Sequence, residues 1–314
     1  MADNGSVSTW PELDYESWKD SALTLQLWTQ IVGKVRLSLT PWLNHSWQVP
    51  FYVTARGLGT SAIPIGPELA EFEFDFLHHR LAGWTSTGRE AAIALRPRSV
   101  ADFYADFREM LATLEIPVHI HEVPNELDDP IPFSRDEIHR DYDMQAVETF
   151  RRVLVQADRV FKQFRTAFLG KASPVHFFWG SFDLAVTRFS GRPAPPHPGG
   201  VPALPDSVAR EAYSHEVSSA GFWPGNAAYP QAAFYSYAYP EPAGYREARV
   251  EGGSFDTALG EYLLPYETVR ASGDPDAVLL AFLQSSYEAA ADCGDWDRNS
   301  LECAIGRPGI PRPV

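Results

Sequence analysis

The sequence predicts an α+β fold of mostly antiparallel sheet with about four main helices. Two long segments are dense in apolar residues at helical spacing, near residues 15–39 and 144–169. Each is followed by short segments in which apolar and polar residues alternate, as in strands with one buried face. Turns that contain glycine or proline separate those segments, and each half ends in a further amphipathic helix.

Four segments are expected to be helices. The first carries apolar residues so densely that we expect it to be buried on most sides. Residues that favour the N-cap position precede the other three: Ser99, Asp143 and Asp274. The four predicted helices span about 15–39, 100–114, 144–169 and 275–291.

Segments rich in aromatic and β-branched residues are expected to be strands. Phe72, Phe74 and Phe76 alternate with acidic residues, which predicts a half-buried strand with an acidic solvent face. In a later segment three tyrosines share one face, namely Tyr235, Tyr237 and Tyr239. The expected strands lie within 47–57, 70–88, 90–97, 117–124, 173–191 and 232–242.

These elements form two α+β halves that we expect to pack as one domain. A disordered tail precedes them, an acidic linker that contains proline joins them, and a C-terminal tail follows. The boundaries are 1–13 for the first tail, 14–125 and 144–297 for the halves, 126–143 for the linker and 298–314 for the last tail.

The two halves show weak internal similarity. Arg36 and Trp47 have the same spacing as Arg165 and His176, and "VTARGLGTSAIP" resembles "VTRFSGRPAPP". The two matches need a three-residue gap between them, so they only suggest a duplicated unit with pseudo-two-fold halves. If the duplication is real, a site would form between the halves, with histidine in the second half where the first has tryptophan.

Composition limits the classes of function. The formal net charge is −15 and no cluster of lysine and arginine occurs, which disfavours nucleic acid and anionic membranes as partners. The two cysteines, Cys293 and Cys303, have no metal-ligand pattern between them and are expected to be reduced thiols. The N-terminus is polar, and no run of apolar residues is long enough to span a membrane. We therefore expect a soluble cytoplasmic protein.

Several long blocks resemble a known family. They are "LWTQIVGKVRLSL", "FYVTARGL", "LRPRSVADFYA", "VLVQADRVFKQFR", "SPVHFFWGSFDLAVTRFSGR" and "EAYSHEVSSAGFWPG". Together they resemble DUF5996, an uncharacterised bacterial family, over nearly the whole chain. The resemblance implies one shared architecture and no known activity, cofactor or catalytic residue.

The segment 173–191 contains the first candidate site, because ionisable residues interrupt an apolar, aromatic stretch. Strand alternation puts His176 and Arg188 on one face and Asp183 on the other. A bulge at Gly180 would instead bring Asp183 to the side of His176. For each residue alone, a hydrogen-bonded core histidine or a buried ion pair is the simpler interpretation.

His215 and Glu216 form a second candidate site. With His176 they would suit a divalent transition metal, although the spacing matches no standard metal motif. Ser219 is close in sequence to His215, but no GxSxG elbow surrounds it, so a nucleophilic serine is poorly supported. No glycine-rich phosphate loop occurs, so no nucleotide cofactor is indicated.

These residues favour a small-molecule enzyme with acid–base or metal-assisted chemistry in the second half. His176 or His215 would be the base or a metal ligand, Asp183 or Glu216 would orient it, and Arg188 would hold an anionic substrate group. The residues expected to bind substrate are Trp179, Ser219, Phe222, Trp223, Gln30 and Lys34. The alternatives are a non-catalytic binding protein for an aromatic or apolar metabolite, and a structural protein with buried polar networks.

Overall fold

The structure is a computed structural model that describes residues 9–312. Its two antiparallel sheets and its helices confirm the α+β prediction. The long helices are α1 (Tyr15–Leu39), α2 (Val100–Thr113), α3 (Met144–Arg165) and α6 (Pro275–Cys293). The short helices are α4 (Asp206–Ala212), α5 (Tyr266–Arg270), α7 (Arg298–Leu301) and the 3₁₀ turns η1 (Asn44–Ser46), η2 (Phe133–Arg135) and η3 (Tyr245–Glu247).

The first sheet has the strand order β1-β2-β4-β5-β6, and β3 pairs with β4. The second has the order β11-β12-β10-β9-β8-β7. The strands of the first sheet are β1 (Tyr52–Val53), β2 (Gly57–Gly59), β3 (Ile63–Ile65), β4 (Glu68–Asp75), β5 (Arg80–Thr85) and β6 (Glu90–Ala94). The strands of the second are β7 (His176–Phe178), β8 (Asp183–Pro193), β9 (His215–Trp223), β10 (Ala233–Tyr239), β11 (Ser254–Asp256) and β12 (Glu261–Pro265).

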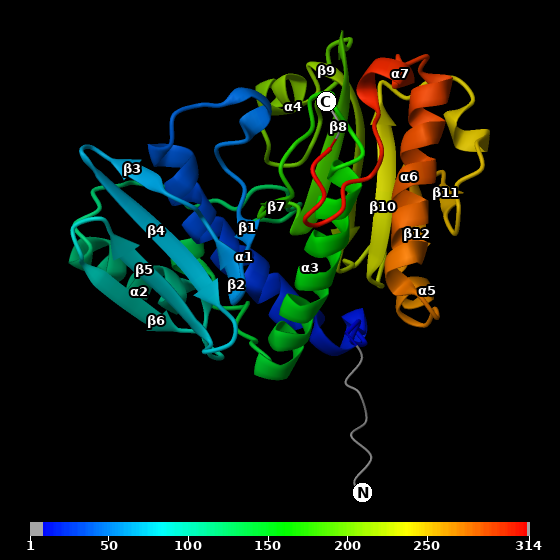
Figure 1. Cartoon of the computed structure of the whole chain (residues 1–314). Helices are drawn as coiled ribbons and strands as arrows, with labels where there is room; N and C mark the ends of the chain where they lie inside the picture. The colour runs from blue at the N-terminus through cyan, green and yellow to red at the C-terminus, as the bar shows by residue number, and fades with distance from the viewer. Residues whose placement is uncertain (1–8, 313–314) are drawn as a thin grey trace, which may run out of the picture.

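The predicted N-caps form as expected. The side chains of Ser99, Asp143 and Asp274 each accept a hydrogen bond from a backbone N–H in the first turn of α2, α3 and α6. Figure 1 shows α1 passing between the first sheet and α3. The side chains of α1 from Leu25 to Val35 are almost all fully buried, as the apolar density predicts.

The two sheets meet at their short edge strands. Phe51 and Phe177 exchange two backbone hydrogen bonds of 2.8 Å, in an isolated antiparallel bridge beside β1 and β7. The halves also share the order long helix, antiparallel strands, helix. This common order agrees with the proposed repeat, but the duplication itself stays a prediction.

Three expected strands differ from the structure. The segment 70–88 contains most of β4 and all of β5, because the chain turns between Phe76 and His79. The segment 173–191 is likewise a hairpin, with β7 paired to β8 across a turn at 179–182. Residues 117–124 form no strand. In the first two segments, alternation continues through a tight turn, so the pattern alone does not reveal where the strand ends.

The described parts of the predicted tails are packed against the protein. Trp10 is buried against Phe234 and Tyr266, although 1–13 was expected to be a disordered tail; residues 1–8 lie outside the described residues. At the other end, the backbone of Leu301 accepts a hydrogen bond of 2.6 Å from Leu169. The ring of Trp10 and the hydrogen bond between Leu169 and Leu301 thus hold in place two segments that were expected to be tails.

The close packing of Trp179 on α1 gives a test of this arrangement. A Cβ at Gly33 would lie 2.4–2.5 Å from atoms of the Trp179 indole. We therefore expect Gly33→Ala to lower the free energy of unfolding by about 2 kcal/mol, although alanine favours helix more than glycine does. Urea denaturation of the variant would measure this loss. Gly273→Ala is the control, because a Cβ there meets nothing within 4 Å; an equal effect of both changes would contradict the packing.

Candidate functional site

The hairpin β7–β8 decides which predicted site residues share a face. Phe178 pairs with Asp183 and His176 pairs with Ala185. Paired residues of antiparallel strands point to the same side. Asp183 therefore lies on the face of His176, and Arg188 lies on the opposite face. The predicted bulge at Gly180 is in fact a turn, and it has the effect that the bulge was expected to have.

Arg188 is fully buried beneath α3 and α6. Its Nη2 donates a hydrogen bond to the backbone oxygen of Phe164 at 2.5 Å, and its guanidinium carbon lies 3.5 Å from the centre of the Phe164 ring. The Tyr287 ring is 4.4 Å away. Helices and rings enclose this arginine, so it does not reach the face of His176 and Asp183, where a substrate group was expected to meet it.

His215 and Glu216 point in opposite directions, as neighbours in a strand do. The ring of His215 lies 5.9 Å from the ring of His45, and Glu216 forms an ion pair of 2.8 Å with Arg192. His176 is opposite Ala185 on β8 and His215 is opposite Pro193. The rings of Trp47 and His45 connect the two histidines, with successive ring centres 5.8, 5.3 and 5.9 Å apart. Within residues 9–312 no group of three or more His, Cys, Asp or Glu residues could hold a metal ion.

The residues expected to bind substrate are spread over the fold. The indole of Trp179 packs against Gly33 of α1 and donates a hydrogen bond to the backbone oxygen of Val49 at 2.9 Å. Phe222 belongs to the core on the helix-covered face, and Trp223 stacks on Tyr229. Ser219 does lie on the face of Asp183, where its hydroxyl is 2.9 Å from that of Thr187.

Gln30 and Lys34 form hydrogen bonds with the backbone of an irregular segment, residues 123–127. Gln30 donates a hydrogen bond to the backbone oxygen of Asn125 and accepts one from its N–H, at 3.0 and 2.8 Å. Lys34 donates to the backbone oxygen of Val123 at 2.7 Å, and burial lowers the pKa of Lys34 to about 8. These two side chains thereby fix the segment that carries Glu126.

Asp183 is the centre of a cluster that the structure does assemble. It is 8 % exposed, and its carboxylate accepts hydrogen bonds from the hydroxyls of Ser181 and Tyr235. Burial raises the pKa of Asp183, and these two hydrogen bonds oppose that rise. Gly221 allows the arrangement, because a Cβ there would lie 2.4 Å from the Tyr235 hydroxyl.

The charge of Asp183 acts on two further carboxyl groups. Glu126 comes from the segment that Gln30 holds, and its carboxylate covers Gly180, where a Cβ would meet it. Glu261 comes from β12. Burial and the nearby Asp183 raise the pKa of each glutamate to about 7. In the part of the chain that the structure describes, neither carboxylate has a hydrogen-bond or ion-pair partner.

Tyrosines form the walls of this cluster. Tyr235 and Tyr237 stack with ring centres 6.1 Å apart, and the hydroxyls of Tyr237 and Tyr213 are 2.7 Å apart. The proline-rich loop after β8 adds His197, whose ring stacks on Tyr213 at 4.7 Å. The loop also contacts the segment that carries Glu126, because the backbone N–H of Glu126 donates a hydrogen bond to the backbone oxygen of Pro202.

Four of these side chains are surrounded by protein but are not fully buried. Burial raises the pKa values of Tyr213, Tyr237, Glu126 and Glu261, which shows that protein surrounds them closely. Yet each of the four keeps part of its surface accessible to solvent. Protein thus surrounds these groups while solvent still reaches them, and we interpret the site as a recess. We call this site, with Asp183 and Tyr235, the acidic recess.

The profile of DUF5996, described as a family of unknown function, matches residues 10–303. The chain belongs to the DUF5996 family. No curated protein and no solved structure matches it.

The acidic recess of this DUF5996 protein was only partly visible in the sequence. Asp183 was expected in the site, and the common face of the three tyrosines of β10 was expected without a role. Glu126 was assigned to the start of the linker, and nothing in the sequence marks Glu261 or Tyr213. A glutamate in an irregular segment signals exposure rather than burial, so only the contacts of its backbone reveal its place.

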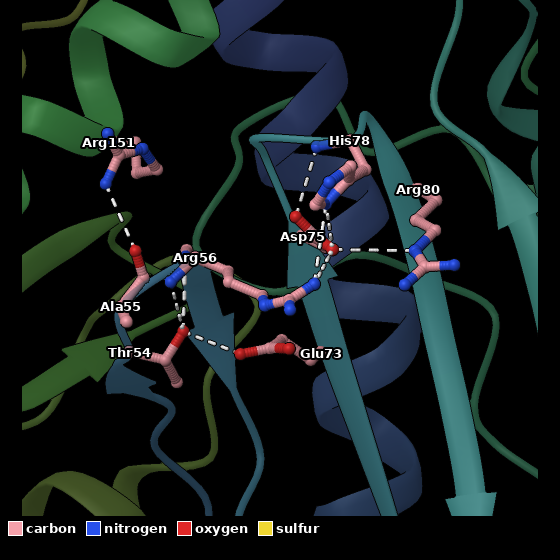
Figure 2. A network of polar contacts seen from close by, with 9 residues as sticks. Thr54, Ala55, Arg56, Glu73, Asp75, His78, Arg80 and Arg151 are labelled. Carbon is pink, nitrogen blue, oxygen red and sulfur yellow. Dashed lines mark hydrogen bonds and ion pairs between the residues drawn. The ribbon is translucent and has the colours of Figure 1, made fainter.

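A second polar cluster surrounds Asp75, at the turn between β4 and β5 (Figure 2). Asp75 is 1 % exposed; Arg56 donates to it at 3.0 Å, His78 contacts it at 2.8 Å and Arg80 lies 3.5 Å away. Burial raises the pKa of Asp75, but the hydrogen bonds from His78 and Arg56 outweigh burial and hold that pKa at about 2. Since its carboxylate is fully satisfied, we interpret this cluster as a support for the turn.

A surface hollow of about 500 Å³ lies beside α7 and is wide open to solvent. Its one basic side chain, Arg298, is already paired with three carboxylates, Glu288, Asp292 and Glu302. The hollow therefore offers no free charged group, and we base the functional argument on the acidic recess instead. No helix of the described chain is long and apolar enough to cross a membrane.

The raised pKa of Glu126 predicts how stability depends on pH. A carboxyl whose pKa rises from 4.5 to about 7 on folding destabilises the fold as pH rises through this range, because the folded state resists losing the proton. At pH 8 we expect the free energy of unfolding of Glu126→Gln to exceed that of the wild type by about 1–2 kcal/mol, after allowance for solvent screening.

At pH 4 the same variant and the wild type should have nearly equal stability, because both side chains are then uncharged. Urea denaturation at the two pH values measures the difference. Glu90→Gln, a change at an exposed glutamate of β6, is the matched control and should show no such dependence on pH. A pH-independent effect of Glu126→Gln would contradict the raised pKa.

Proposed function

We propose that the protein is a small-molecule enzyme that uses acid–base chemistry in the acidic recess of its second half. One observation supports this most directly: Glu126 and Glu261 are carboxyl groups without hydrogen-bond partners in the described chain, with pKa values of about 7. A general acid or base works best when its pKa is near the working pH. Asp75, which we interpret as structural, is instead paired and has a lowered pKa.

The residues of the recess suit different roles. Glu126 and Glu261 would act as the acid and the base, with one protonated and the other ionised near neutral pH. Because the two groups are coupled through Asp183, they would titrate as a set, and the observed pKa values would belong to the set. Asp183, held by Ser181 and Tyr235, would orient the substrate through its carboxylate.

The charge of the recess limits the substrate. The charged groups that act on Glu126 and Glu261 are all acidic, namely Asp183 and Asp256. An anionic substrate would be repelled, and its binding would raise the carboxyl pKa values further. We therefore infer a neutral or positively charged substrate, with an apolar or aromatic part that packs on the tyrosine walls.

The tyrosine walls also support a second function, non-catalytic binding of an aromatic metabolite. Tyr235 and Tyr237 are stacked on the sheet, and His197 is stacked on Tyr213 at the edge of the recess. Such rings bind flat ligands without any proton transfer. Turnover, rather than binding, therefore separates the two functions.

We also propose a cytoplasmic location. Cys293 and Cys303 are both unpaired in the structure. Unpaired thiols are typical of proteins from reducing compartments, where disulfides rarely persist.

A metabolite screen tests the proposal. The purified protein would be incubated with neutral, cationic and anionic compounds, and loss of substrate followed by mass spectrometry. We expect turnover of a neutral or cationic compound, with kcat lowered at least about 100-fold by Glu126→Gln or Glu261→Gln, because a general acid or base contributes this much. Glu90→Gln should keep the wild-type kcat.

Two outcomes would count against the enzyme. If both variants turn over the compound like the wild type, the chemistry lies outside the recess. If an aromatic compound binds, is not converted, and loses affinity when Tyr237 is changed to alanine, the protein is a binding protein. Circular dichroism of each variant checks that the fold is intact.

A further inference from the structure

Basic side chains without carboxylate partners gather beside His176, outside the acidic recess. Arg36 lies in the last turn of α1 and Arg165 in the last turn of α3. The positive charges of both act on the ring of His176. Tyr52 connects Arg36 to His176, because its ring lies 5.5 Å from the guanidinium carbon and its hydroxyl lies 3.5 Å from Nε2 of the histidine.

Arg36 is 5 % exposed and is bound only by uncharged groups. Its Nε donates to the backbone oxygen of Gln48 at 2.5 Å and its Nη1 to the hydroxyl of Ser61 at 2.6 Å. Its guanidinium lies 5.5 Å from the centre of the Tyr52 ring. No carboxylate within residues 9–312 forms an ion pair with it. Burial accordingly lowers the pKa of Arg36.

Arg165 has fewer partners still. In the described chain its side chain has no hydrogen bond and no ion pair, and its Nε is buried without an acceptor. Arginines in the last turn of a helix do interact favourably with the backbone carbonyls there. That interaction accounts for the charge of Arg165 but supplies no acceptor for its buried N–H.

His176 has an unsatisfied nitrogen at the same place. The residue is 1 % exposed, its Nδ1 is buried without a partner, and its Nε2 lies 3.5 Å from the Tyr52 hydroxyl. Burial and the two arginine charges lower the pKa of His176 to about 3, so the ring is neutral at pH 7. A neutral imidazole still has one N–H to donate.

The whole group therefore has donors in excess of acceptors. Leaving one buried donor without a partner costs about 1–3 kcal/mol, and more for a charged group. The protein has 41 acidic and only 26 basic residues, so a carboxylate partner was not scarce. Planar guanidinium groups are the groups that bind carboxylates and phosphates with two parallel hydrogen bonds.

We propose that Arg36, Arg165 and His176 form a binding site for a small oxyanion, a carboxylate or phosphate group, at the junction of the two sheets. Tyr52 and Arg165 keep partly exposed surface, so the anion would enter from their side. The site uses none of the carboxyl groups of the acidic recess and does not depend on the function proposed for them.

Titration calorimetry with inorganic phosphate and, separately, with acetate tests this site at constant ionic strength. We expect saturable binding of at least one anion by the wild type, weakened at least tenfold in Arg165→Gln. Lys162→Gln is the matched control: it removes the same charge from the same helix, one turn earlier, where the lysine pairs with Asp158 at the surface. Its affinity should stay within twofold of wild type.

The choice between the two anions identifies the group that the natural ligand carries. Arg36→Gln is not used as a second variant, because loss of this buried side chain is expected to weaken the fold. NMR of ¹⁵N-labelled histidine supplies the second readout instead. The anion should shift the ring signals of His176 in the wild type and in Lys162→Gln, and not in Arg165→Gln.

The proposal is overturned if neither anion binds saturably, or if Arg165→Gln binds as tightly as Lys162→Gln. Binding that leaves the His176 signals unchanged would likewise place the anion elsewhere and overturn it. None of these results bears on turnover in the acidic recess, so the two proposals fail independently.

Discussion

The arrangement of this protein depends on the burial of α1 on nearly all sides. Water cannot reach a buried helix, so its long polar side chains need hydrogen-bond partners within the protein. Gln26, Gln30, Lys34 and Arg36 do so by donating to backbone oxygens of irregular segments, at Gly180, Asn125, Val123 and Gln48. One helix thereby fixes the turn before Asp183, the segment of Glu126 and the approach to β1. Both candidate sites are held by the same scaffold.

The fold was predictable to the extent that it depends on local pattern. The ends of α1 agree with the predicted range of about 15–39. The turns inside the segments 70–88 and 173–191 were not, because alternation continues through them. Asp183 could be chosen from the sequence as a buried acid. Glu126 and Glu261 could not, because their burial comes from contacts between distant segments that composition does not report.

His176 and Asp183 illustrate how one physical effect gives opposite results on a shared sheet face. Burial disfavours the charged form of any group. It therefore lowers the pKa of the histidine and raises that of the carboxyl. The charges of two arginines add to the lowering at His176, whereas the hydrogen bonds from Ser181 and Tyr235 oppose the rise at Asp183. Arg36 and Arg165 also occupy matching positions in the two halves of the sequence, each 11 residues before Trp47 and His176.

The bridge between Phe51 and Phe177 has a consequence for the order of folding. It joins residues roughly 125 positions apart in the chain, and closing a loop of that length costs about 4 kcal/mol of chain entropy. Its two backbone hydrogen bonds contribute only about 2 kcal/mol. The bridge therefore cannot nucleate folding. Each sheet must first assemble through its own short hairpins, and the oxyanion site at their junction would be among the last features to form.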